Sequence, residues 1–121
     1  MIEAVCVCVK NKDGLYLSIS RKDNHDLIGF VGGKIDPNET PLDAIIRESY
    51  EECGLELINI VYLDKTFDDT GILVHFFKAD ISNEPVQKEG EGIIYWVTKE
   101  DLINKSPYKE YNNLMLNKFN L

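Results

Sequence analysis

Three glutamates are crowded into the stretch RESYEECG, residues 47 to 54. On a helix, Glu48, Glu51 and Glu52 would lie three and four positions apart, so their carboxylates would project into one small region. Like charges at this spacing repel by roughly 0.2 to 0.5 kcal/mol per pair. Hard cations such as Mg²⁺ and Mn²⁺ prefer oxygen ligands of this kind. The spacing favours a divalent cation site, and a solvated acidic face is the alternative.

A glycine-rich loop precedes these acids, giving the stretch GGKIDPNETPLDAIIRESYEECGL at residues 32 to 55. It resembles the box of the Nudix hydrolase family, G-x5-E-x7-R-E-U-x-E-E-x-G-U, where U is a bulky apolar residue. Ser49 stands where the family has an aliphatic residue. The other eight of the nine specified positions match: Gly33, Glu39, Arg47, Glu48, Glu51, Glu52, Gly54 and Leu55.

The resemblance implies a role for each residue of the box. The three helix glutamates, Glu48, Glu51 and Glu52, are expected to take part in catalysis and to bind Mg²⁺ or Mn²⁺. The backbone carbonyl of Gly32 is expected to be a further metal ligand. Arg47 would orient Glu48 or a neighbouring carboxylate through bidentate hydrogen bonds, and an ordinary surface ion pair is the alternative.

Residues outside the acidic helix are also expected to contribute. Glu39 would stabilise the loop and helix and take no part in the chemistry. The segment Lys88-Glu89-Gly90 resembles a late loop that supplies a further carboxylate in family members that hydrolyse nucleoside triphosphates. We predict Glu89 as this catalytic and metal-binding residue. Glu91 is the alternative, and a merely solvated loop acid is the other possibility.

Three residues near the box are candidates for substrate binding. Arg21 and Lys34 could contact phosphate groups, and Phe30 could line a pocket for the base. Ordinary surface cations and a core aromatic ring are the alternatives for these three positions.

The reaction that the resemblance implies is attack of water on a phosphorus of a nucleoside diphosphate-linked compound. A nucleoside triphosphate, split into monophosphate and pyrophosphate, is the leading substrate. ADP-ribose, dinucleoside polyphosphates and nucleotide sugars are alternatives. The region 68 to 72 lacks the proline or tyrosine that several such family members carry there. A non-catalytic nucleotide sensor is the alternative from another class, and the complete glutamate set argues against it.

Bulk composition limits the class of protein. The chain has 121 residues, of which 44% are hydrophobic and 28% charged, as expected for a single globular domain over residues 1–121. Its net charge of −8 disfavours nucleic acid polymers and anionic membranes as partners. The three cysteines and the absence of a secretory pattern predict a cytoplasmic protein. Monomer and homodimer both remain open.

The acidic residues are expected to lie on a helix from Pro41 to Cys53. Thr40 can cap its first turn, and Gly54 is typical of a helix end. The residues predicted to face the core are those on one side of this helix, and the glutamates would lie opposite or beside them. The core-facing set is Leu42, Ile45, Ile46, Ser49 and Cys53.

Alternating and continuous apolar runs predict the strands around this helix. Turn residues at 11–14 and at 68–71 predict two hairpins, and helices are expected after Thr98 and after Ser106. This order predicts an α+β protein, an α/β/α sandwich with a central mixed β-sheet, which is also the Nudix fold that the resemblance implies. The predicted strands are 2–9, 15–20, 55–63, 72–79 and 93–97.

Overall fold

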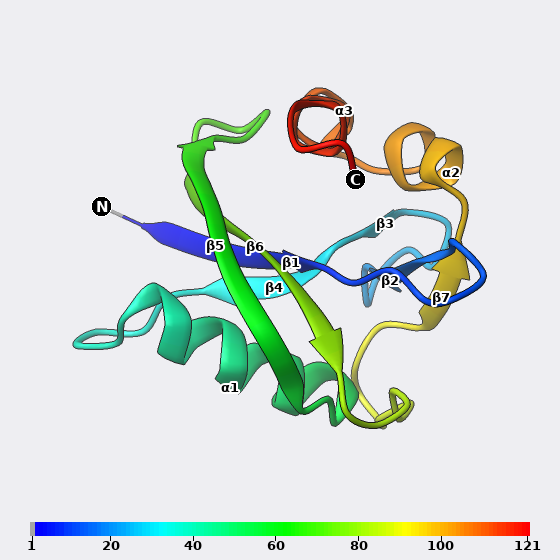
Figure 1. Cartoon of the computed structure of the whole chain (residues 1–121), viewed down its shortest axis with the longest axis horizontal. Helices are drawn as coiled ribbons and strands as arrows, with labels where there is room; N and C mark the ends of the chain where they lie inside the picture. Colours follow the sequence, from blue (N-terminus) through cyan, green and yellow to red (C-terminus); the bar gives the residue numbers. More distant parts are fainter. Residues whose placement is uncertain (1) are drawn as a thin grey trace.

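The computed structural model describes residues 2 to 121. Four strands precede α1, and three strands and two helices follow it. Figure 1 shows the strands lying between α1 on one side and α2 and α3 on the other. The elements are β1 (Glu3–Cys8), β2 (Tyr16–Ser20), β3 (Ile28–Gly29), β4 (Val31–Lys34), α1 (Pro41–Cys53), β5 (Leu57–Phe67), β6 (Leu73–Ile81), β7 (Ile94–Val97), α2 (Lys99–Asn104) and α3 (Lys109–Lys118).

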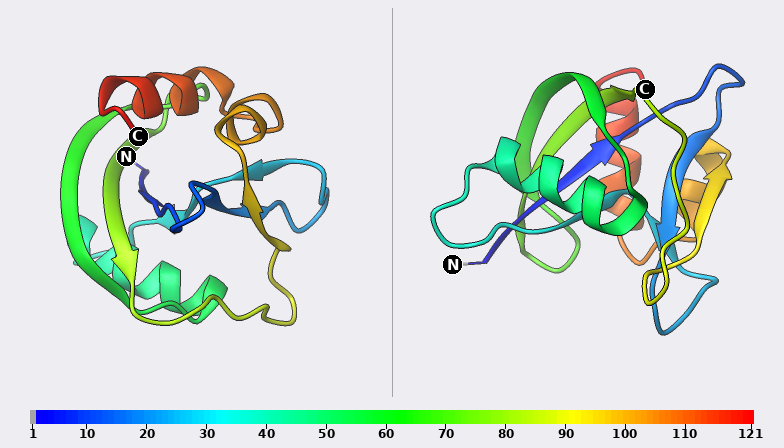
Figure 2. Two further views of the ribbon diagram at one scale, coloured as in Figure 1. Left: turned by 45° about the vertical axis from the view of Figure 1, so that its right-hand side comes forward. Right: turned by 90° about the horizontal axis from the view of Figure 1, so that it is seen from below.

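The strands form two sheets. A four-stranded sheet has the order β4-β1-β6-β5, in which β1 and β6 run parallel and the other neighbours run antiparallel. A smaller antiparallel sheet has the order β3-β2-β7 and lies to one side of the first, as the views in Figure 2 show. The predicted α+β sandwich with a mixed sheet is confirmed, with the correction that a second sheet accompanies the central one.

The predicted hairpin of the first two strands is only partly correct. The turn brings Leu17 N–H to the Val9 carbonyl at 2.9 Å, and Lys10 pairs with Tyr16. Beyond this point β1 and β2 diverge into different sheets, because both edges of β1 are already occupied by β4 and β6. The second predicted hairpin, β5 with β6, is confirmed, and its turn is closed by the Gly71 N–H donating to the Asp68 carbonyl.

Strand β1 divides the core into two halves. Val5 and Val7 pack in the cluster on the side of α1, whereas Cys6 and Cys8 pack in the cluster on the side of α3. Because successive side chains of a strand point to opposite faces, a strand covered on both sides must be apolar throughout. The cysteines are buried free thiols.

Helix α1 has the predicted bounds and the predicted caps. The Thr40 hydroxyl accepts a hydrogen bond from the Asp43 N–H at 3.1 Å. Gly54 adopts a left-handed φ of 62°, which glycine reaches without steric cost, and its N–H donates to the carbonyls of Ser49 and Tyr50. These local signals end the helix where the sequence predicts.

The buried face of α1 is rotated from the predicted one. Leu42 and Ile46 are each 46% exposed, which corrects their assignment to the core. Ile45, Ser49 and Cys53 are buried as predicted, and Ala44 is buried as well, because the helix packs against β4 and β1 along these residues. Because of this rotation, Glu48 and Glu52, which flank the buried face, lie toward β4.

The C-terminal helices follow the predicted signals with one shift. Thr98 caps α2 by accepting from the Asp101 N–H, as predicted. Helix α3 begins at Lys109, later than Ser106, because the Ser106 hydroxyl accepts from the Tyr108 N–H in a turn that precedes the helix. None of the helices within residues 2 to 121 is long and apolar enough to cross a membrane.

We predict that Ser49→Ala stabilises the protein by about 1 kcal/mol, measured by urea denaturation. Ser49 is fully buried, and its hydroxyl has no hydrogen-bond partner among residues 2 to 121. Removing an unsatisfied buried hydroxyl from a helix removes a desolvation cost. Ser18→Ala is the matched control, because the buried Ser18 hydroxyl donates to the Tyr95 carbonyl at 3.0 Å and its loss should destabilise. A destabilised Ser49→Ala protein contradicts this account.

Candidate functional site

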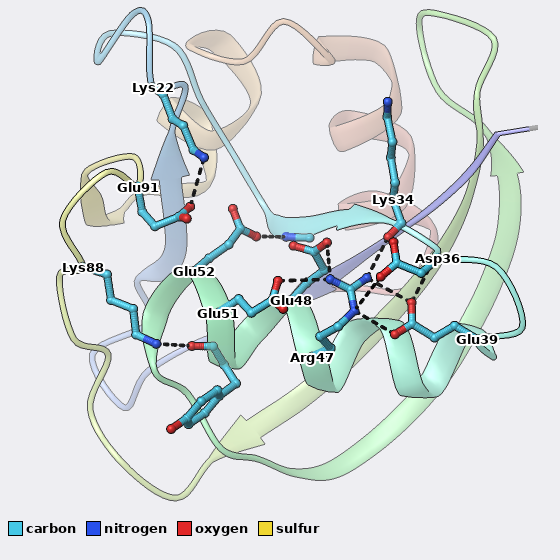
Figure 3. Close-up of polar contacts among 12 residues, drawn as sticks. Lys22, Lys34, Asp36, Glu39, Arg47, Glu48, Glu51, Glu52, Lys88 and Glu91 are labelled. Carbon is cyan, nitrogen blue, oxygen red and sulfur yellow. Dashed lines mark hydrogen bonds and ion pairs between the residues drawn. The ribbon is translucent and has the colours of Figure 1, made fainter.

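Arg47 lies where the glycine-rich loop meets α1, and its guanidinium donates five hydrogen bonds (Figure 3). Nε and Nη2 donate to the two carboxylate oxygens of Glu39 at 2.7 and 3.0 Å. Nη1 donates to Glu48 at 3.0 Å and to Glu51 at 3.1 Å, and Nη2 also donates to the Lys34 carbonyl at 3.0 Å. Arg47 therefore makes the expected bidentate pair with Glu39, and it orients Glu48 and Glu51 through one hydrogen bond each.

Glu39 closes the loop before α1. Its side chain is only 12% exposed and also accepts from the Asp36 N–H at 2.9 Å. The hydrogen bonds from Arg47, followed by the one from Asp36, lower the pKa of Glu39 to about 2. Glu39 therefore stays ionised and joins the loop to the helix, in agreement with the stabilising role expected for it.

Glu48 and Glu52 lie side by side against β4. A Cβ on Gly33 would lie 2.5 Å from the Glu48 carboxylate, so only glycine permits this approach. The Gly32 N–H donates to Glu52 Oε1 at 3.2 Å. The Gly32 N–H and the absence of a side chain at Gly33 thus accommodate the two carboxylates, which Figure 3 shows projecting from α1.

The two carboxylates are in a different electrostatic environment from Glu39. Burial raises the pKa of Glu48 despite its bond to Arg47. Burial, followed by the charges of Glu48 and Glu91, raises the pKa of Glu52 to about 8, while the Gly32 N–H opposes the rise. Among residues 2 to 121, Glu52 has no ion-pair partner within 4.0 Å.

This donor set fits a divalent cation. The pKa values of both partly buried carboxylates are raised, Glu48 has a single hydrogen bond from Arg47, and Glu52 has no ion pair within residues 2 to 121. Both present hard oxygen ligands. Glu51 is turned toward Arg47, and within the described part of the chain no three metal-ligating side chains already converge on one point. Mg²⁺ needs only one or two protein carboxylates, because it keeps water and takes substrate phosphates as its other ligands.

The late loop places Glu91 near Glu48 and Glu52, which together form the acidic cluster. Within residues 2 to 121, no hydrogen bond or ion pair links Glu89 to this cluster. Glu91 is 23% exposed, faces Glu52 in Figure 3 and lies 3.6 Å from the Lys22 ammonium. Glu89 is exposed. Gly90 turns the chain between them with a φ of 81°, so that the structure brings Glu91, the alternative, to the other acids, while the role predicted for Glu89 stays a prediction.

A cavity of about 200 Å³ adjoins the acidic cluster, and Gly32 and Gly33 line it as well. Phe30 lines this cavity and also packs edge-on against Phe76, with ring centroids 5.3 Å apart, so it serves both as core and as pocket wall. Asn112 lines it from α3. Sequence reasoning missed Asn112, because a polar residue in an exposed-looking helix gives no signal of burial.

Asn112 offers polar groups to the cavity. Its side chain is 2% exposed, and its Nδ2 donates to the Leu102 carbonyl at 3.0 Å. A side-chain amide carries two N–H donors and one oxygen acceptor. One N–H and the oxygen are therefore left for a ligand.

The structure does not bring the predicted phosphate contacts to the cluster. The Arg21 guanidinium pairs with Asp23 at 3.1 Å in an exposed loop. The Lys34 ammonium points away from the acids in Figure 3, and only its carbonyl joins the network. Lys22, one residue after Arg21, reaches the cluster instead because it pairs with Glu91.

We predict that Glu52→Gln stabilises the metal-free protein at pH 8 by on the order of 1 kcal/mol, after allowance for solvent screening. Because the pKa of Glu52 is raised from 4.5 to about 8, folding retains a proton that the unfolded chain releases, and stability falls as pH rises through this window. Urea denaturation between pH 4 and pH 9 should show the gain vanish toward pH 4.

Glu51→Gln is the matched control for this substitution, since it removes the same charge from the same helix. Glu51 is 56% exposed and pairs with Arg47 at 3.1 Å, so its substitution should leave stability unchanged or slightly lower. An equal gain in stability in Glu51→Gln and Glu52→Gln would contradict a destabilisation that is specific to the Glu52 charge.

Comparison with known proteins places this geometry in a family. The model of the NUDIX domain matches residues 2–119. An 8-oxo-dGTP diphosphatase of Proteus vulgaris is 38% identical over 65 residues, which cover 50% of this chain and 58% of that protein. A CTP pyrophosphohydrolase of Escherichia coli K12 is 39% identical over 59 residues, covering 46% of this chain and 43% of that protein. The matches thus span about half the length of these two relatives.

A solved structure extends the likeness in fold to nearly the whole chain. The structure of an Ap4A hydrolase of C. elegans in a binary complex superimposes with a TM-score of 0.78 and 20% sequence identity, covering 98% of this chain and 96% of that one. From the match over residues 2–119, the chain belongs to the NUDIX domain family.

Proposed function

We propose that the protein is a divalent-metal-dependent pyrophosphohydrolase that converts nucleoside triphosphates to monophosphates and pyrophosphate. The observation that carries the proposal is the pair of half-buried carboxylates, Glu48 and Glu52, beside a cavity that shares Gly32 and Gly33 with them. The names of the two matched relatives, 8-oxo-dGTP diphosphatase and CTP pyrophosphohydrolase, support the substrate class.

The cavity is suited to a nucleobase. Phe30 presents an aromatic ring, and Asn112 offers an amide for hydrogen bonds to a base edge. A base bound here would direct its phosphates past the glycine pair toward Glu48 and Glu52. The protein carries a net charge of −8, so an anionic substrate needs a cation at this point to offset repulsion.

Each residue of the cluster has a task in the proposed reaction. Glu48 and Glu52 would hold Mg²⁺ or Mn²⁺, with the Gly32 carbonyl as a further ligand, while Arg47 fixes the direction of Glu48. When bound, the metal supplies charge neutralisation of the phosphates and lowers the pKa of bound water. Attack of water on the α- or β-phosphorus would break the anhydride bond between them, and the leaving group would be pyrophosphate or the nucleoside monophosphate, respectively. Glu91, which lies across from Glu52 and is 23% exposed, would bind the same cation as a further ligand and would accept the proton of the water.

The proposed setting follows from the same observations. The substrate is a small nucleotide, and the acidic surface gives no support for a nucleic acid polymer as partner. Three buried free cysteines are consistent with a reducing cytoplasm.

We predict release of pyrophosphate from at least one nucleoside triphosphate in a panel that includes 8-oxo-dGTP and CTP, with Mg²⁺ or Mn²⁺ present. Products should be identified by mass spectrometry in oxygen-18 water, which reports the phosphorus attacked. Chelation with EDTA should abolish turnover, because without the cation the anionic carboxylates repel the phosphates and no metal lowers the pKa of the attacking water. Absence of any turnover, or turnover that persists after chelation, contradicts the proposal.

Glu91→Gln should lower kcat by about 100-fold or more, as expected for loss of a general base, whereas Glu89→Gln should change kcat by less than about twofold. Both substitutions remove one charge from the same loop, so Glu89→Gln serves as the matched control. Steady-state kinetics with the best substrate of the panel provides the measurement. The reverse order of effects would restore Glu89 as the late-loop carboxylate.

A further inference from the structure

We propose that Lys88 is a positioning residue that holds the late loop, residues 82 to 92, on the C-terminal end of α1 and thereby sets Glu91 opposite Glu52. The inference rests on the proposed function, in which Glu91 belongs to the metal site. It concerns a lysine that touches neither the cavity nor the glutamate carboxylates.

The Lys88 ammonium binds the last turn of α1. Its Nζ donates to the Tyr50 carbonyl at 2.7 Å and lies 4.6 Å from the centroid of the Tyr50 ring (Figure 3). The last carbonyls of a helix carry partial negative charge, and a cation there is stabilising. The last turn of α1 contains no basic residue of its own. Through Lys88, the late loop therefore supplies the positive charge that the C-terminal end of α1 lacks.

Neighbouring contacts hold the rest of the loop to the same helix end. The Val86 N–H donates to the Cys53 carbonyl at 2.7 Å, and the Asn83 Nδ2 donates to the Gly54 carbonyl at 2.8 Å. A Cβ on Gly54 would lie 3.4 Å from Val86 Cβ and 3.5 Å from Lys88 Cε. The loop thus packs closely on the end of the helix that carries Glu52.

A short turn transmits this attachment to Glu91. The Glu91 N–H donates to the Lys88 carbonyl at 3.3 Å, with Glu89 and Gly90 between them. Fixing Lys88 therefore fixes the backbone from which the Glu91 side chain projects. Release of Lys88 would let this turn move and would spread Glu91 over many positions relative to Glu52.

The loss of the Lys88 charge and the loss of its positioning role should change the affinity for Mn²⁺ in opposite directions. Removing a positive charge near an acidic cluster should, through Coulomb interaction alone, strengthen the binding of a divalent cation. Losing a correctly placed carboxylate ligand should weaken it. The direction of the change in Mn²⁺ affinity therefore separates the two effects.

The test measures Mn²⁺ binding to metal-free protein by isothermal titration calorimetry. Lys88→Met keeps the aliphatic stem, and we expect it to raise the Kd for Mn²⁺ about three- to tenfold. Hydrogen exchange of residues 83 to 92 should become faster in the same variant. Lys12→Met is the control with the same charge change, because Lys12 is exposed in a turn and makes no hydrogen bond or ion pair within the described residues; its Kd should match wild type.

A double-mutant cycle with Glu91→Gln identifies the route of the effect. Glu91→Gln should itself raise the Kd, and adding Lys88→Met should then change the Kd by less than about twofold. An unchanged or lower Kd in Lys88→Met, or an undiminished effect in the Glu91→Gln background, overturns the inference. If the wild-type protein binds Mn²⁺ but hydrolyses no nucleotide, the proposed function is refuted, while the double-mutant cycle still tests the role of Lys88. If the wild-type protein binds no Mn²⁺, the proposed function and the role of Lys88 are both refuted.

Discussion

The guanidinium of Arg47 is the interaction on which the geometry of the candidate site depends. It joins the Lys34 carbonyl at the end of β4, the Glu39 carboxylate of the loop and two carboxylates of α1. A lysine has three donors on one nitrogen and could not span this set, whereas the planar fork of arginine can. Arg47 therefore joins the glycine-rich strand, the loop and the acidic helix, and the hydrogen bond from the Gly32 N–H to Glu52 adds a second link between strand and helix.

This network divides the glutamates of one motif into two electrostatic classes. Glu39 receives a bidentate pair, and its pKa falls to about 2, so it is permanently charged and structural. Glu52 receives only the Gly32 N–H, and burial raises its pKa to about 8. Titratable groups with strongly perturbed pKa values beside a cavity are typical of functional sites. Glu52 has no positively charged partner within residues 2 to 121, and a divalent cation would supply that positive charge.

Features set by local signals were predictable from sequence, and features set by distant contacts were not. The bounds of α1 followed from Thr40 and Gly54, whose capping hydrogen bonds stay within the helix and its flanks. The exposure of Leu42 and Ile46 depends on how α1 lies on β4 and β1, which periodicity alone does not determine. The predicted hairpin of β1 and β2 forms only at its turn for the same reason, since β4 and β6 occupy both edges of β1.

The candidate site divides in the same way. The contacts of Glu48 and Glu51 with Arg47 lie within one helix, and the resemblance to the family implied that Arg47 orients Glu48 or a neighbouring carboxylate. The choice of Glu91 over Glu89 depends on a turn at Gly90, and the contribution of Asn112 depends on α3 folding back over the cavity. No short sequence pattern contains these two arrangements, because each joins segments far apart in the chain.

The most direct test of the account is an anomalous-difference map from crystals of the protein grown with Mn²⁺ and a non-hydrolysable nucleoside triphosphate analogue. The account predicts a manganese peak in contact with the carboxylates of Glu48 and Glu52, with the phosphates bound to the same ion and the base in the cavity lined by Phe30 and Asn112. A map without manganese at Glu48 and Glu52, with the nucleotide bound elsewhere, would contradict it.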